Sequence, residues 1–105
     1  MAWFYLFIAS IFEITWAISL KYTQGFTQFW PSIITIAGLT ASFVFLAKAA
    51  VTLPIGTAYA VWTGIGAAGT LILGIILFHE PIHVYRLFFF CLLLIGIIGL
   101  KITAN

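Results

Sequence analysis

Residues 49–78 read AAVTLPIGTAYAVWTGIGAAGTLILGIILF and contain no charged side chain. A helix needs about 20 mostly apolar residues to cross the roughly 30 Å hydrocarbon core of a bilayer, and this stretch exceeds that length. Pro54 stands near its start, where a proline fits the first turn of a helix or the loop before it. The stretch therefore predicts a transmembrane helix.

The remainder of the chain repeats this pattern three times. Residues 22–47 carry no charge, and residues 1–20 carry only Glu13. The last uncharged run, 87–100, is lengthened by apolar neighbours, because Arg86 and Lys101 can snorkel from its two ends. We predict an all-α membrane protein with a single four-helix transmembrane domain over residues 1–105, its helices at roughly 2–20, 29–50, 55–77 and 84–102.

Composition supports this class. Of the 105 residues, 65% are hydrophobic and 6% are charged, against about 25% charged in an ordinary soluble domain. High hydrophobicity with little charge excludes disorder, and scattered basic residues exclude a nucleic-acid partner. Cys91 has no second cysteine to pair with. No basic residue precedes Glu13, which indicates that the first span is not a cleaved signal peptide.

The basic residues are divided equally between the two ends of the predicted bundle. Lys48 and Lys101 fall on one side of the membrane, and Lys21 and Arg86 fall on the other. Because an excess of Lys and Arg sets orientation, this balance predicts a chain that inserts in both directions. Such a chain can pair with an inverted copy of itself, forming an antiparallel, dual-topology homodimer.

Two motifs resemble enzyme sites. His79-Glu80-Pro81-Ile82-His83 matches the H-E-x-x-H pattern of zinc peptidases, but Pro81 opposes a continuous helix there, and no third ligand follows. Residues 64–69 match G-x-G-x-x-G inside a span, without the strand or the acidic residue of a dinucleotide site. We therefore expect no metal, no cofactor and no enzymatic activity.

Glycines inside membrane helices indicate close contacts between helices or a hinge. Gly64, Gly66 and Gly69 are assigned to packing or a hinge in the third span. Gly96 and Gly99 mark a contact in the fourth span, and their spacing leaves open whether it lies within the bundle or between subunits.

Glu13 is the only acidic residue within a span. An intramembrane carboxylate usually faces a wet cavity or the protein interior and marks an ion or proton path. The alternative, a structural pair with a buried cation, has no partner, because no Lys, Arg or His lies in the middle of a span. Removal from water disfavours the charged carboxylate, so a proton and an arriving organic cation are expected to compete for Glu13. In a dimer, two such carboxylates meet.

Polar and aromatic side chains are spaced to share the site. Trp16 lies on the same helix face as Glu13, and Tyr59 and Trp62 repeat that spacing in the third span. Ser42 lies in the second span. Aromatic pairs at this spacing are more often part of a core, but beside a carboxylate they supply hydrogen-bond donors and cation–π contacts. We expect these four residues to line or support the site.

The chain resembles the small multidrug resistance transporters over essentially its full length. The resemblance rests on Phe12-Glu13-Ile14-Thr15-Trp16-Ala17, Leu20-Lys21-Tyr22, Gly25-Phe26-Thr27, residues 53–66 (LPIGTAYAVWTGIG), Glu80-Pro81 and Gly96-Ile97-Ile98-Gly99-Leu100-Lys101. It implies an antiparallel homodimer in the bacterial inner membrane with proton exchange at Glu13 and dimer contacts from the fourth helix. Trp16 and residues 63–66 are similar to the guanidinium-exporter subtype, while Gln28 and Ser10 replace the Arg and Gly common there.

The leading functional prediction is a proton-coupled antiporter that exports guanidinium. Guanidinium is planar and can donate two parallel hydrogen bonds to a carboxylate, whereas a quaternary ammonium ion has no N–H group. The alternatives are a multidrug exporter of quaternary ammonium and other lipophilic cations, one subunit of a heterodimeric pair, and a passive cation pore. One carboxylate without a base or a nucleophile supports no enzymatic reaction scheme.

Overall fold

The computed structural model describes residues 1–103 and is entirely helical apart from its connections. Its helices are α1 (Ala2–Tyr22), α2 (Phe29–Ala50), α3 (Ile55–Phe78) and α4 (Val84–Thr103). Each is long and apolar enough to cross a membrane. All four begin at the predicted residue, and the ends differ from prediction by two residues at most. The all-helical, four-span part of the fold prediction is confirmed.

Local backbone chemistry ends the helices. After α1, three successive residues, Gln24, Gly25 and Phe26, take positive φ angles, a region that stops a right-handed helix. The Thr23 hydroxyl reinforces this turn by donating to the Leu20 carbonyl (2.6 Å) and accepting from the Phe26 N–H (3.2 Å). His79, with φ of 55°, caps α3 in the left-handed conformation.

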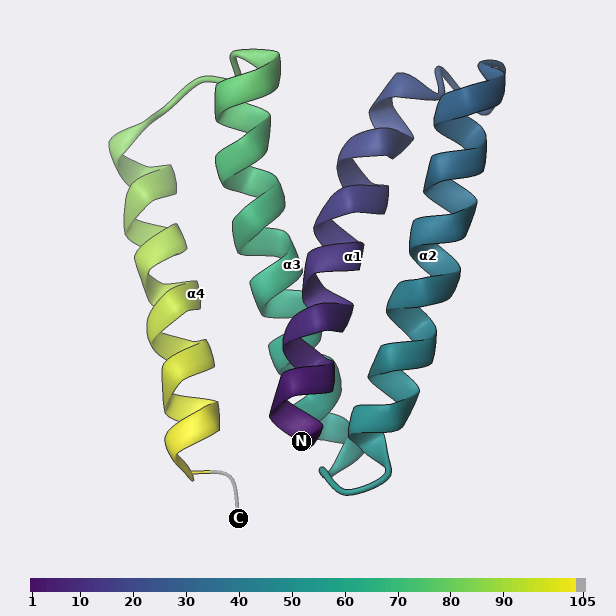
Figure 1. Cartoon of the computed structure of the whole chain (residues 1–105). Helices are drawn as coiled ribbons and strands as arrows, with labels where there is room; N and C mark the ends of the chain where they lie inside the picture. The colour runs from purple at the N-terminus through teal and green to yellow at the C-terminus, as the bar shows by residue number, and fades with distance from the viewer. Residues whose placement is uncertain (104–105) are drawn as a thin grey trace.

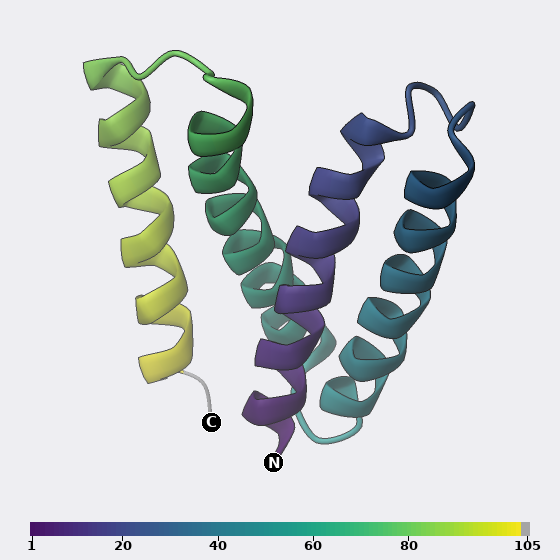
Figure 2. The ribbon, with the colours of Figure 1, turned by 45° about the horizontal axis from the view of Figure 1, so that its top comes forward.

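Figure 1 shows α1 between α2 and α3, with α4 on the outer side of α3. Helix α1 begins and α4 ends at the same end of the bundle, as an even number of spans requires. In Figure 2, α1 and α3 cross near their N-terminal ends and diverge toward their C-terminal ends. The Cα atoms extend 43 × 35 × 16 Å, so the protomer is a thin slab rather than a rounded bundle.

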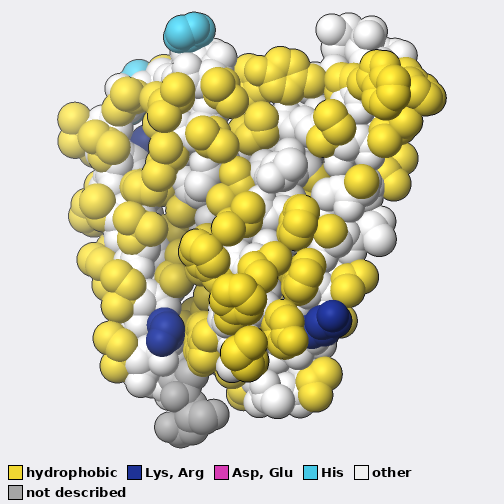
Figure 3. All heavy atoms as spheres, in the orientation of Figure 1, with side chains coloured by type: hydrophobic (Ala, Val, Ile, Leu, Met, Phe, Trp, Pro, Cys, Tyr) yellow, Lys and Arg dark blue, Asp and Glu magenta, His cyan; other side chains and the backbone are white. Residues whose placement is uncertain are grey.

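The buried core is small and lies where the helices cross. Its members come from the start of α1, the end of α2 and the start of α3: Leu6, Ala9, Leu46, Ala49, Ala58, Val61 and Trp62. Outside it, large apolar side chains cover the surface, and the face drawn in Figure 3 is mainly hydrophobic, with basic side chains toward its ends. A continuous apolar surface of this kind fits contact with lipid or with another protein.

Candidate functional site

A buried hydrogen-bonded bridge joins three helices close to Glu13. Ser42 of α2 donates from its hydroxyl to the Ala9 carbonyl of α1 at 2.7 Å. The indole N–H of Trp62, from α3, donates to the same Ser42 oxygen at 2.9 Å. Ser42 is fully buried and Trp62 is 4% exposed. Because Ala9 lies one helical turn before Glu13, this bridge fixes the position of the α1 segment that carries the carboxylate.

The bridge occupies the donor groups of Ser42 and Trp62. Ser42 and Trp62 each have a single proton to donate, and both protons are used within the bridge. Neither residue therefore donates to Glu13 in this structure. Both residues lie in the bridge that holds the α1 segment carrying Glu13.

Glu13 rests against the backbone of α3. A Cβ atom built on Gly66 would overlap the Oε1 and Cδ atoms of Glu13 and lie 2.8 Å from its Cγ. Oε1 is buried and has no hydrogen-bond partner in the described part of the chain. An ionised carboxylate buried without a partner is costly. This position therefore suits a carboxyl group in its neutral form.

Trp16 lies at the contact between α1 and α2. A Cβ atom on Gly38 would stand 3.1 Å from the Trp16 Cβ, so the two helices approach closely at this point. The indole Nε1 of Trp16 is buried and, among residues 1–103, finds no acceptor. Glu13 and Trp16, three residues apart, thus each carry an unpaired buried polar atom. Such atoms are rare in folded proteins, and each calls for a partner such as a water, an ion or a ligand.

Tyr59 lies at the surface of the protomer. It is 56% exposed, and its ring centroid is 5.6 Å from that of Trp62. Phe43 of α2 contacts the same indole at 5.4 Å. The structure therefore brings Tyr59, Trp62 and Ser42 together as predicted, with the tyrosine on the outer side of the group.

The glycines of α3 each face a different neighbour. A Cβ on Gly64 would lie 2.8 Å from Cγ1 of Ile97 in α4, and a Cβ on Gly69 would overlap Ile14 of α1. Together with Gly66, they let α3 approach α1 and α4 closely, which agrees with the packing interpretation.

Gly96 and Gly99 have a different environment. A Cβ at either position would meet nothing within 4 Å in the described protomer. An added side chain at either position would therefore point into open space beside the described protomer.

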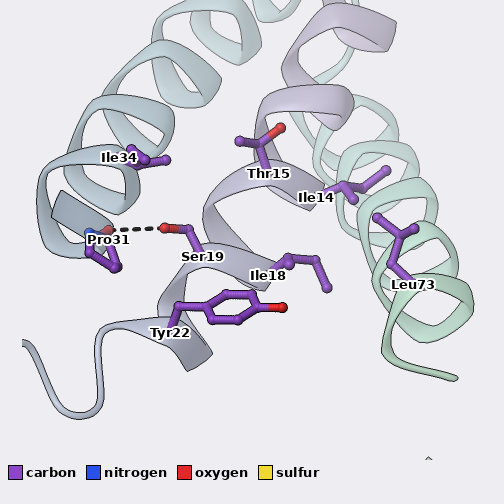
Figure 4. A pocket seen from close by; sticks show the side chains of 8 residues that line it. All are labelled: Ile14, Thr15, Ile18, Ser19, Tyr22, Pro31, Ile34 and Leu73. Atoms are coloured by element: carbon purple, nitrogen blue, oxygen red, sulfur yellow. Dashed lines mark hydrogen bonds between the residues drawn. The ribbon is translucent and has the colours of Figure 1, made fainter. Parts of the chain in front are cut away.

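A hollow of about 360 Å³ lies between α1, α2 and α3, on the side of Glu13 toward the end of α1. Figure 4 shows its lining: Ile14, Thr15, Ile18, Ser19, Tyr22, Pro31, Ile34 and Leu73. Its Ser19 hydroxyl already donates to the Pro31 carbonyl at 2.9 Å. Because the lining is almost wholly apolar and carries no charge, the hollow does not offer a cation a binding partner.

The H-E-x-x-H stretch has no zinc-site geometry. Residues 79–83 form a non-helical connection, so the two histidines do not share a helix face. Within residues 1–103 there is no group of three His, Cys, Asp or Glu side chains placed to hold a metal ion.

A family model described as Small Multidrug Resistance protein matches residues 1–93. The chain belongs to the small multidrug resistance family. Full-length relatives agree: proteins named Guanidinium exporter from Proteus vulgaris (53% identical over 104 residues, 99% of this chain and all of the relative) and Yersinia pestis (54%, the same coverage). A further Guanidinium exporter, from Salmonella typhimurium, is 53% identical over the whole of both chains. The chain is thus a multi-pass protein of the bacterial inner membrane.

Some features of this small multidrug resistance protein were not predicted. The hydroxyls of Ser19 and Thr35 form a buried cluster with the Pro31 carbonyl, joining α1 to α2. The presence of Ser and Thr within apolar spans was the feature of the sequence that could have indicated this cluster. Ser10, which replaces a common glycine, is fully buried and donates to the Leu6 carbonyl at 2.9 Å, so its hydroxyl is satisfied within α1.

Proposed function

We propose that this protein is a proton-coupled antiporter that exports guanidinium and binds both the cation and the proton at Glu13. The observation that carries the proposal is a lone intramembrane carboxylate with a buried, unpaired oxygen. The full-length relatives named Guanidinium exporter support the choice of substrate. Small substituted guanidines belong to the same substrate class because they keep the N–H groups.

The site chemistry suits a flat cation with several N–H groups. Guanidinium can donate two parallel, charge-assisted hydrogen bonds to a carboxylate. It also supplies the positive charge that no Lys, Arg or His in the middle of a span provides for Glu13. Aromatic faces from Trp62 and the exposed Tyr59 contribute cation–π attraction beside the bridge that holds α1 in place.

Coupling follows from competition for one carboxylate. A protonated Glu13 cannot bind guanidinium as an ion pair, and a Glu13 occupied by guanidinium cannot hold a proton. When only an occupied site changes sides, this exclusion produces antiport. In a dimer with two Glu13 residues, two protons leave for one monovalent cation. That exchange moves one net charge, so transport responds to membrane potential at about 2.3 kcal/mol per 100 mV.

The partner in the proposed dimer is a second copy of the chain, held mainly through α4. No residue of α4, over residues 84–103, is buried within the protomer; α4 packs mainly against α3, and its Lys101 lies over the Trp3 ring of α1. Gly96 lies on this helix with open space around it. Small residues allow two membrane helices to approach closely, so the uncovered face of α4 suits contact with another copy.

Gly96→Val is expected to weaken the dimer by about tenfold while leaving each protomer folded. The added side chain overpacks a helix contact, at about 1–3 kcal/mol, and 1.4 kcal/mol corresponds to tenfold. Fluorescence energy transfer in liposomes of increasing lipid content measures the equilibrium. Gly56→Val is the matched control, since a Cβ at Gly56 also meets open space. An unchanged equilibrium in Gly96→Val would move the interface elsewhere.

The two protomers of the proposed dimer are antiparallel. Reporters fused to the C-terminus are expected to show both orientations, because Lys48 and Lys101 balance Lys21 and Arg86. One added lysine tips this balance. Gln28→Lys, in the α1–α2 connection, and Thr52→Lys, in the α2–α3 connection, lie at opposite ends and are both exposed. They are expected to bias the chain in opposite directions. A single orientation in the unmodified chain would contradict the proposal.

Uptake into sealed liposomes tests the function directly. Purified protein is given guanidinium or tetrapropylammonium, each with and without a pH gradient. Gradient-dependent uptake of guanidinium alone supports the proposal. Strong uptake of both cations favours the multidrug alternative, and guanidinium flux that ignores the gradient favours a pore. No uptake of either cation by folded dimer points to a heterodimer with a missing second subunit.

A further inference from the structure

Glu13 occupies a place that exists only because residue 66 is a glycine. We call the α3 surface at Gly66 that receives Oε1 the Gly66 notch. One Cβ atom there would overlap the carboxyl group itself, whereas at Gly64 and Gly69 it would meet Ile97 and Ile14. Gly66 is thus the α3 glycine that faces the carboxyl group of Glu13; Gly74, near the end of α3, faces that of Glu80 in the following connection.

The notch contains nothing that stabilises a charge. Oε1 is buried there and, within residues 1–103, has no hydrogen-bond donor. Lys101 of α4 lies over the Trp3 ring near the start of α1, and the helices packed closely against α1 are α2 and α3. Their titratable side chains are Lys48, in the last turn of α2, and Tyr59, in the second turn of α3, both exposed. On α1 itself the others are Tyr5, Lys21 and Tyr22, toward the helix ends.

We propose that Gly66 is a positioning residue: its notch holds Glu13 in the protonated form, and loss of the proton drives the side chain out of the notch to where a cation can reach it. This rests on the proposed function and adds a structural step to it. A neutral carboxyl group tolerates burial without partners far better than an ionised one. The carboxylate therefore leaves the notch for water or for a cation.

With the notch, the Glu13 side chain has one position in which it holds a proton and another in which it binds the cation. In the first position Glu13 is withdrawn against α3 and uncharged. In the second it is free to bind the substrate. The notch stabilises the first position and so sets the pH at which protons displace the substrate. A residue that fills the notch removes the first position but leaves the carboxylate and its substrate contact intact.

Gly66→Ala tests this step, with Gly69→Ala as the matched control. Both variants add one methyl group to the same α1–α3 contact, and only the first meets the carboxyl group. The pH at which guanidinium binding is half-maximal is expected to fall by about one unit in Gly66→Ala, since burial can shift carboxyl protonation by up to several units. In Gly69→Ala it is expected to stay within a few tenths of a unit of the unmodified protein.

A measurement on the unmodified fold keeps the test independent of whether Gly66→Ala folds. A protonated carboxyl group without hydrogen bonds has a higher infrared carbonyl frequency than a hydrogen-bonded one. The chain has only two acidic side chains, so the band is readily assigned. We expect a high-frequency band that persists in Glu80→Gln, disappears in Glu13→Gln and is lost or lowered in Gly66→Ala.

Failure of this step can be told apart from failure of the proposed function. Equal pH profiles for Gly66→Ala and Gly69→Ala, or a Glu13 band at the hydrogen-bonded frequency, would overturn the notch while proton-coupled uptake stands. Guanidinium binding in the unmodified protein that does not compete with protons would instead overturn the function itself, and the notch proposal with it.

Discussion

Replacing Glu13 with glutamine is expected to reduce proton-driven guanidinium uptake by at least about 100-fold. Glutamine keeps the size of the side chain but removes the charge, so it forms neither the ion pair nor the exchangeable proton. A hydrogen bond to a charged group contributes about 1.5–3 kcal/mol. Two such bonds together therefore exceed the roughly 2.8 kcal/mol that corresponds to a 100-fold change. Uptake of guanidinium into liposomes with a pH gradient measures the loss.

Glu80→Gln is the matched control for this substitution. It makes the same chemical change at the chain's only other acidic side chain, which lies in the α3–α4 connection outside the helices. Uptake by this variant is expected to stay within about twofold of the unmodified protein, because the half-buried carboxyl group of Glu80 lies outside the helices and contacts Gly74 rather than the site around Glu13. Undiminished, gradient-dependent uptake by Glu13→Gln would remove the proposed mechanism.

Removing the Ser42 hydroxyl is expected to weaken both the fold and transport. Ser42→Ala leaves the buried Trp62 N–H without an acceptor, and an unsatisfied buried donor costs about 1–3 kcal/mol. The same change removes the hydrogen bond to the Ala9 carbonyl, so the turn of α1 that precedes Glu13 is no longer fixed to α2. We expect a lower free energy of unfolding in detergent by that amount, together with a several-fold loss of guanidinium uptake.

Ser32→Ala separates this effect from that of losing any α2 hydroxyl. The Ser32 hydroxyl donates to the Gln28 carbonyl, near the start of its own helix, and joins no other element. Its loss is expected to leave unfolding and uptake close to those of the unmodified protein. Equal behaviour of the two variants would show that the bridge between the three helices does not support the site.

The helix boundaries could be predicted because residues at or next to each boundary determine them. Pro54 precedes α3 directly, and Gly25 lies in the turn that follows α1. Runs of apolar residues without charge then leave only helices as spanning elements, since the backbone must satisfy its own hydrogen bonds in lipid. The small differences arose at C-terminal ends, where α1 continues through Lys21 and Tyr22 before the left-handed turn.

The identity of the central carboxylate could also be predicted, but its surroundings could not. Glu13 stands out by its chemistry in an apolar span, whatever the packing. In contrast, the faces that α1, α2 and α3 turn toward one another could not be predicted. These helices are apolar all round, so periodicity cannot select a buried side. Consequently, neither the bond between Trp62 and Ser42 nor the contact of Glu13 with Gly66 was visible in the sequence.

Helix α4 makes few contacts within its own protomer, so its stability depends on how concentrated the protein is in the bilayer. This helix packs mainly against α3, touches α1 through Lys101 over the Trp3 ring, and buries none of its residues within the protomer. In the proposed dimer, most of the packing of α4 therefore comes from association, which obeys mass action. Apparent stability then depends on the ratio of protein to lipid, and a sparsely loaded membrane would loosen the last helix before the first three.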